Sequence, residues 1–129
     1  MKMKFQLLAM MFIAALAFSA CGDDDKNDGI TVPDAVSKAL KNKYPAATDI
    51  EWERKGDYFV ADCWMDGKEM DVWYDTQAVW RLTEVDILWG SLPPTVQTAF
   101  ESGEYANWKR EDIDMLEYPV QPVQYVIEV

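Results

Sequence analysis

The feature that most constrains this chain is an internal repeat. Residues 32–40 (VPDAVSKAL) align with residues 92–100 (LPPTVQTAF), one copy 60 positions after the other. Each copy carries proline in what would be the first turn of a helix, where the missing N–H costs little. Thr31 and Ser91 precede the two copies and are placed to cap free backbone amides. The repeat therefore predicts two helices that begin in the same way.

Both predicted helices are apolar on one side only. Pro45 ends the first and Gly103 follows the second, because neither residue continues a helix. A helix with one apolar stripe must pack that stripe against another layer. The residues of the two stripes are Val36, Ala39, Leu40 and Tyr44 in the first copy, and Val96, Ala99 and Phe100 in the second.

Between the helices, apolar residues recur at every second position, which is typical of strands. Asp66-Gly67 is a strong two-residue turn signal and sets the pairing of the strands on either side. Lys55-Gly56 reads as a second two-residue turn, and residues 76–78 as a three-residue turn in which Ala78 stands where glycine is preferred. The three turns agree on one apolar face, predicted to pack under the helices: Ile50, Trp52, Phe59, Ala61, Cys63, Met65, Met70, Val72, Tyr74, Trp80 and Leu82.

The opposite face of this predicted meander combines acidic and aromatic residues. Arg81 is expected opposite Trp73, within reach of a cation–aromatic contact. Fixed aromatic rings are frequent anchors of protein interfaces, although carboxylates on a sheet can also serve only to keep it soluble. The candidate protein-binding residues on this face are Tyr58, Val60, Asp62, Trp64, Glu69, Asp71, Trp73 and Arg81.

The second repeat is shorter than the first. Residues 112–118 and 123–129 read as two strands joined by a turn at 119–122. No residues follow to form a third and fourth strand, so the last strand is expected at a sheet edge. That edge pairs with another chain, or the domain evolved without the missing strands, or the reading frame is cut short. The fold class predicted is α+β, with tandem helix-plus-antiparallel-meander units forming one sheet and the helices packed on one face.

The N-terminal residues have the layout of an export signal. Two lysines precede an apolar run at 5–18 that is too short to span a membrane as a helix. Residues 18–21 (FSAC) resemble a lipobox, in which Cys21 is lipidated after cleavage and anchors the protein to a membrane. Residues 1–20 are thus predicted to be a lipoprotein signal peptide, and residues 21–30 an acidic flexible tether.

Charge and composition exclude several functions. Loss of the two lysines in the signal peptide would change the formal charge from −11 to −13, which disfavours nucleic-acid binding. The chain has no histidine, so Cys63 has no imidazole base, and we expect this thiol to be buried and unreactive. Asp62 beside Asp71 could serve as an acid–base pair, but a flat solvated sheet would not separate their pKa values. We expect no catalytic residues, no cofactor and no metal ligands.

These motifs together resemble the PepSY-like, putative beta-lactamase-inhibitor-like family of envelope lipoproteins. The resemblance rests on the helix-opening prolines, on residues 49–52 (DIEW), 66–69 (DGKE) and 73–75 (WYD), and on the restart at 91–93 (SLP). It covers residues 31–129, with repeat one at 31–88 and an incomplete repeat two at 91–129. It implies a sheet built from tandem units and a role in binding or inhibiting proteins such as hydrolases, without established active-site residues.

The sequence therefore predicts a non-enzymatic envelope lipoprotein that binds a protein through its acidic and aromatic sheet face. The partner should have a basic or mixed surface, because a strongly acidic domain repels acidic partners. The protein is expected in the bacterial cell envelope, as an outer-membrane lipoprotein that is exposed at the surface or faces the periplasm. Two alternatives remain open: a module that responds to weakly bound calcium, and a purely structural component of the envelope.

Overall fold

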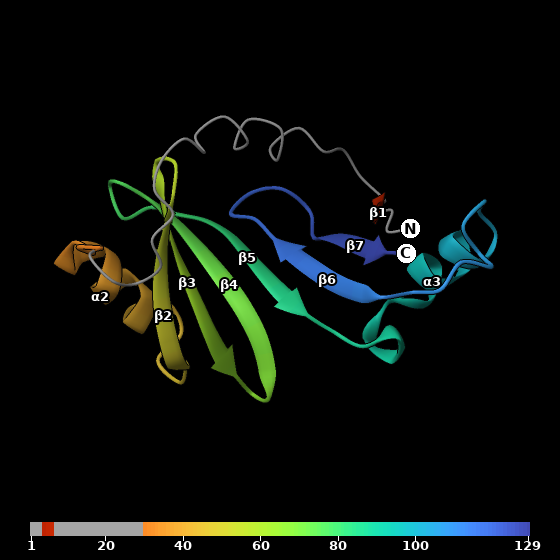
Figure 1. The fold of residues 1–129 in the computed structure, drawn as a ribbon, viewed down its shortest axis with the longest axis horizontal. Helices are drawn as coiled ribbons and strands as arrows, with labels where there is room; N and C mark the ends of the chain where they lie inside the picture. Colours follow the sequence, from red (N-terminus) through yellow and green to blue (C-terminus); the bar gives the residue numbers. More distant parts are fainter. Residues whose placement is uncertain (1–3, 7–29) are drawn as a thin grey trace.

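The computed structural model describes residues 4–6 and 30–129 (Figure 1). The expected signal peptide except residues 4–6, the expected lipidation site Cys21 and residues 21–29 of the expected tether lie outside the described residues. Within these residues the fold consists of two α-helices and a seven-stranded antiparallel sheet. This arrangement confirms the predicted α+β class with tandem helix-plus-meander units.

The two helices begin at the repeated proline segments. Helix α2 spans Asp34–Lys43 and α3 spans Pro94–Glu101, with a short 3-10 turn, η2, at Trp89–Ser91 before α3. The expected caps from Thr31 and Ser91 were wrong, because neither helix has a side-chain cap. Pro33 and Pro93 have extended backbones and occupy the N-cap positions of the two helices. Thr31 and Ser91 each lie two residues before the N-cap, too far from the first turn to bond its free amides. Neither α2 nor α3, the helices of the described part, is long and apolar enough to cross a membrane.

The strands follow one another across the sheet in chain order, except the first. Strand β1 lies on the outer side of β7, so that the order is β1-β7-β6-β5-β4-β3-β2. In Figure 1 the ribbons fan out from β2 beside α2 to β7 near α3. The strands are β1 (Lys4–Gln6), β2 (Thr48–Lys55), β3 (Tyr58–Met65), β4 (Lys68–Asp75), β5 (Trp80–Asp86), β6 (Asp112–Glu117) and β7 (Gln124–Glu128).

The hairpin of β3 and β4 has the predicted register. Met65 pairs with Lys68 and Phe59 with Tyr74, as expected from a turn at Asp66-Gly67. Both turn residues have positive φ, at 55° and 74°. A turn with two left-handed residues matches the twist of the flanking strands, which explains why this dipeptide sets the register so strongly.

The hairpin of β2 and β3 turns one residue later than expected. Lys55 pairs with Tyr58, so the turn residues are Gly56 and Asp57, and Gly56 takes the positive φ of 62°. Trp52 consequently pairs with Ala61 instead of Phe59. The pairing moves by two residues, and because side chains alternate with a period of two, each side chain stays on its predicted face.

The hairpin of β4 and β5 contains a bulge that the sequence did not predict. Tyr74 pairs with Trp80 as expected, but Trp73 pairs with Leu82, which leaves Arg81 as an extra residue. A bulge of one residue moves the rest of the strand to the opposite face. The placement of Leu82 under the helices was therefore wrong, and Thr83 takes the buried position instead.

Two apolar clusters hold the helices against one face of the sheet. Val36 and Leu40 of α2 pack with residues of β3 and β4, and Phe100 of α3 packs with Ile113 and Ile127 of β6 and β7. Val85 of β5 contacts both clusters, so the helices cover the same side. Every residue predicted for the first core lies in or against the first cluster except Leu82. The opposite side of the sheet has no helix over it among the described residues, and we call it the helix-free face.

Candidate functional site

A groove of about 1010 Å³ lies on the helix-free face, between the ends of β3 to β5 and the segment that joins β6 to β7. We call it the aromatic groove. Its apolar lining comes from four strands and that connection, which brings together side chains far apart in the sequence. The main apolar residues in the lining are Tyr58, Trp73, Leu82, Leu116 and Tyr118.

Three contacts hold Trp73 in place in the aromatic groove. Its ring meets Tyr58 edge to face, with centroids 5.8 Å apart. The indole Nε1 donates a hydrogen bond to Glu84 Oε1 at 3.0 Å, and Lys55 Nζ lies 5.5 Å from the ring centroid. A ring fixed in this way offers apolar area to a partner at a low cost in side-chain entropy.

Arg81 does not contact Trp73, and the expected cation–aromatic pair was wrong. The bulge places Arg81 beside Asp75, where Nη2 and Nε lie 2.9 and 3.0 Å from Oδ2. Burial alone would raise the pKa of Asp75. Hydrogen bonds from the amides of Val79 and Gln77, together with Arg81, outweigh it and lower the pKa below its usual range. The ion pair therefore stays charged at the groove rim at neutral pH.

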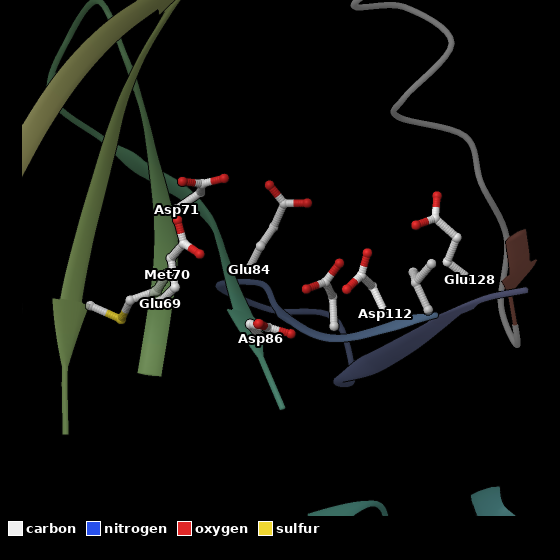
Figure 2. Close-up of a pocket in the computed structure, with 9 residues that line it drawn as sticks. Glu69, Met70, Asp71, Glu84, Asp86, Asp112 and Glu128 are labelled. Carbon is white, nitrogen blue, oxygen red and sulfur yellow. The ribbon is translucent and has the colours of Figure 1, made fainter. Parts of the chain in front are cut away.

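An acidic trough adjoins the aromatic groove on the same face. Glu51 pairs with Asp62, Asp62 with Asp71, and Asp71 with Glu84, so that one row of carboxylates crosses four strands. Figure 2 shows carboxyl groups of β4 to β7 rising from the same side of the ribbons around a hollow of about 280 Å³. The acidic residues that line this trough are Glu69, Asp71, Glu84, Asp86, Asp112, Asp114 and Glu128.

Asp71 is the most strongly perturbed carboxyl group in the trough. Burial, followed by the charges of Asp62 and Glu84, raises its pKa from 3.8 to about 7. Burial and the neighbouring Asp62 also raise the pKa of Glu69. A raised pKa means that negative charge is poorly compensated here, and a cationic group placed over the row would gain from it.

The described residues give no support to metal binding or nucleophilic chemistry. Within residues 30–129, no three acidic or cysteine side chains converge closely enough to hold a metal ion. Cys63 is fully buried, and burial followed by Asp62 and Asp71 raises its pKa to about 11. Its thiol stays protonated and out of contact with solvent.

The structure divides the eight predicted binding residues among several places. Tyr58, Trp73 and Arg81 line the aromatic groove, whereas Glu69 and Asp71 line the acidic trough. Trp64, with 44% of its surface exposed, stands on the helix-free face outside both hollows, and Asp62 belongs to the carboxylate row. The expectation of an exposed Val60 was wrong: it is 2% exposed, because neighbouring side chains cover it.

Sequence reasoning missed several residues of the face. Leu82 lines the aromatic groove only because of the bulge at Arg81. No residue type in β5 predicts a bulge at this position. Leu116 could have been found, because Met115 and Leu116 are consecutive apolar residues and so must point to opposite faces. The acidic residues of β6, Asp112 and Asp114, alternate with buried Ile113 and carried the same signal.

Fold and face together define the class of the protein: a two-layer α+β module whose sheet is covered on one side and hollowed on the other. The chain belongs to the putative beta-lactamase-inhibitor-like, PepSY-like family, whose model matches residues 28–63 and 57–129. This finding confirms the resemblance on which the sequence analysis relied. No curated protein matches the chain.

Solved structures from Bacteroides species share the fold. A BLIP-like protein from Bacteroides fragilis is 44% identical, with a TM-score of 0.72 over 78% of this chain and 72% of that one. A DUF2874 family protein from Bacteroides ovatus is 35% identical, with a TM-score of 0.73 over 77% and 71% of the two chains. A protein from Bacteroides eggerthii, described as a putative periplasmic protein, is 29% identical, with a TM-score of 0.73 over 76% and 71%.

Proposed function

We propose that this chain is a non-enzymatic, inhibitor-like envelope lipoprotein that binds a protein through the aromatic groove and the acidic trough beside it. The family supports the inhibitor-like character. Cys21 would carry the lipid that anchors the domain, and the acidic segment that follows would serve as a tether between the membrane and the domain. The likeness to a Bacteroides protein described as periplasmic supports an envelope location.

The observation that carries the proposal is the aromatic groove itself. Trp73 and Tyr58 are held by each other and by Glu84, yet both stay partly open to solvent on a face without a helix. Interfaces draw most of their binding energy from a few such anchors set in a pocket. The charged groups around them, Lys55 and Arg81 with Asp57 and Asp75, give the rim both signs of charge.

Substitution of the groove anchors tests the proposal. The lipidated domain, or its full chain in detergent, is used to capture proteins from envelope extract before and after Trp73→Ala. We expect the captured partner to be lost from the variant, with affinity reduced by about 30-fold or more, as for an interface anchor worth about 2 kcal/mol. Trp108→Ala is the matched control, because Trp108 is 38% exposed and lies between α3 and β6, away from the groove.

A second arm separates inhibition from binding alone. A purified serine beta-lactamase is the probe, and its hydrolysis of a chromogenic cephalosporin is followed as the domain is added. Inhibition that Trp73→Ala removes and Trp108→Ala leaves intact would support an inhibitor of this class. Equal capture by Trp73→Ala and the unaltered chain would contradict the groove as the binding site, whatever the result with the enzyme.

A further inference from the structure

Three hairpin ends surround the aromatic groove. Because the strands follow one another as a meander, the connections β2–β3, β4–β5 and β6–β7 lie at the same end of the sheet. Each of them contributes a wall of the groove, through Asp57, Gln77 and Val120 respectively. The acidic trough is lined from the other end, by residues near the starts of β4 and β6 and near the ends of β5 and β7. The two hollows therefore follow one another along the strands.

Glu84 joins the two hollows, because it lines both of them. Its Oε1 accepts the hydrogen bond from Trp73 Nε1 in the groove, and it pairs with Asp71 across β4 and β5. On the neighbouring level of the same two strands, Trp73 pairs with Leu82. An apolar level, formed by Trp73 and Leu82, thus lies directly beside an acidic level, formed by Asp71 and Glu84.

The distance between the two levels determines which side chains of a partner can meet both. Asp71 and Trp73 are two residues apart in β4 and point to the same face, so about 7 Å separates their positions along the strand. An extended segment that lies along β4 advances by the same distance every two residues, and those side chains share one side. Residues i and i+2 of such a segment therefore reach both levels, whereas residues i and i+1 point in opposite directions.

The acidic level is only partly balanced by the positive charges of this face. Both cations that line the groove have other carboxylate partners, since Arg81 binds Asp75 and Lys55 Nζ lies 3.6 Å from Glu53. The pKa of Asp71 is raised by burial and then by neighbouring carboxylates, which is the sign of uncompensated negative charge. An arginine or lysine brought to this level by a partner would balance the charge through charge-assisted hydrogen bonds.

We propose that the helix-free face binds an extended segment of a partner protein, in which an apolar residue packs on Trp73 and an arginine or lysine two residues away lies over Asp71 and Glu84. This inference rests on the proposed function and adds to it the chemistry of the bound segment. A second copy of this chain does not fit, because a symmetric interface would place the acidic level against itself.

Three peptides of one length test the proposal on the isotope-labelled full chain in detergent at pH 8, above the pKa of about 7 of Asp71. All are acetylated and amidated. The probe is Arg-Ser-Phe-Ser-Arg, which offers the required spacing in both chain directions. The charge control is Glu-Ser-Phe-Ser-Glu, and the spacing control is Ser-Arg-Phe-Arg-Ser. NMR titration of the Trp73 Nε1–H signal gives each dissociation constant, and we expect the probe to bind about tenfold more tightly than either control, as for one charge-assisted contact.

Asp71→Asn and Glu101→Gln are a matched pair of variants, because each removes one negative charge with little change in size. Glu101 is exposed on α3, on the covered side of the sheet. Asp71→Asn should weaken binding of the probe by about fivefold, because the basic residue loses a charged partner. Glu101→Gln should change it by less than about twofold, since solvent and salt screen distant charges.

Several results would overturn the proposal. No shift of the Trp73 signal with the probe would remove the segment, equal binding of the charge control would remove the basic residue, and equal binding of the spacing control would remove the register. An equal loss in Glu101→Gln and Asp71→Asn would reduce the effect to net charge. A shift with protein concentration alone would make a second copy the occupant. Protein capture that Trp73→Ala abolishes can still succeed when the peptides fail, which separates failure here from failure of the proposed function.

Discussion

Asp71 stands directly across from Asp62 on neighbouring strands, with Glu84 on its other side, so that three carboxyl groups share one level of the helix-free face. Like charges directly opposite each other destabilise a sheet. A surface that keeps such a row gives up stability in the free protein. The arrangement is understandable if the row exists to meet positive charge on a partner.

This row makes stability depend on pH near neutrality. Asp71 has a folded pKa of about 7 against an ordinary value of 3.8, so the folded state holds a proton that the unfolded state releases between these values. Its contribution is fully present below the unfolded pKa and is lost as pH rises through 7. We expect Asp71→Asn to stabilise the protein by about 1–3 kcal/mol at pH 8 and to change little at pH 4. Urea unfolding at the two pH values measures the difference, and an effect that is the same at both would contradict the raised pKa.

Tyr74 carries a buried hydroxyl with no hydrogen-bond partner among the described residues. Burial is the first cause of its raised pKa, about 12. An unsatisfied polar group is costly to bury, so Tyr74→Phe should be neutral or should stabilise the fold by up to about 1 kcal/mol. Thermal unfolding of the variant tests this.

Tyr44 is the matched control for Tyr74, because its hydroxyl is bonded. It lies 2.8 Å from Thr83 Oγ1, which also accepts a hydrogen bond from Trp80 Nε1. Tyr44→Phe should destabilise by about 1 kcal/mol, and Thr83→Val by about 1–3 kcal/mol, because the latter leaves the partly buried Tyr44 hydroxyl and Trp80 Nε1 without their shared partner. A loss for Tyr74→Phe as large as that for Tyr44→Phe would show that the Tyr74 hydroxyl has a partner.

Ala78 has a φ of 65° in the turn between β4 and β5. A left-handed residue with a side chain costs roughly 1–2 kcal/mol, and glycine removes this strain at some entropic cost. We expect Ala78→Gly to raise the free energy of unfolding by about 0.5–1 kcal/mol. Gly67→Ala is the reverse experiment, since an added Cβ there would meet no atom within 4 Å and only the φ of 74° opposes it. It should destabilise by about 1 kcal/mol, and a neutral result would contradict the backbone argument.

The sequence predicted strand register and sheet faces correctly where a turn residue or the two-residue alternation of a strand determines them. Asp66-Gly67 gave the register of β3 and β4 correctly, and the period of two kept the faces right even where the turn beside Gly56 was placed one residue early. The bulge at Arg81 could not be predicted, because it depends on how β4 and β5 twist together. That single residue decided both the location of Leu82 and the partner of Arg81.

The sequence predicted which residue types lie on the helix-free face, but not the hollows that they line. Alternation placed Trp73 and Asp71 on the correct face, but not the hollows into which they open. The aromatic groove needs Leu116 and Tyr118 from the second repeat, and their approach to Trp73 follows from the pairing of β5 with β6. Pairing between distant strands leaves no signal in either strand alone.

Photo-crosslinking in intact cells tests most directly whether the helix-free face docks a protein. Benzoylphenylalanine replaces Val120, which is 91% exposed at the rim of the aromatic groove, or Leu88, which is 79% exposed and outside it. The account predicts a discrete protein adduct from position 120 that Trp73→Ala abolishes, and none from position 88. Adducts of equal yield from both positions, or none from position 120 while position 88 reacts, would contradict it.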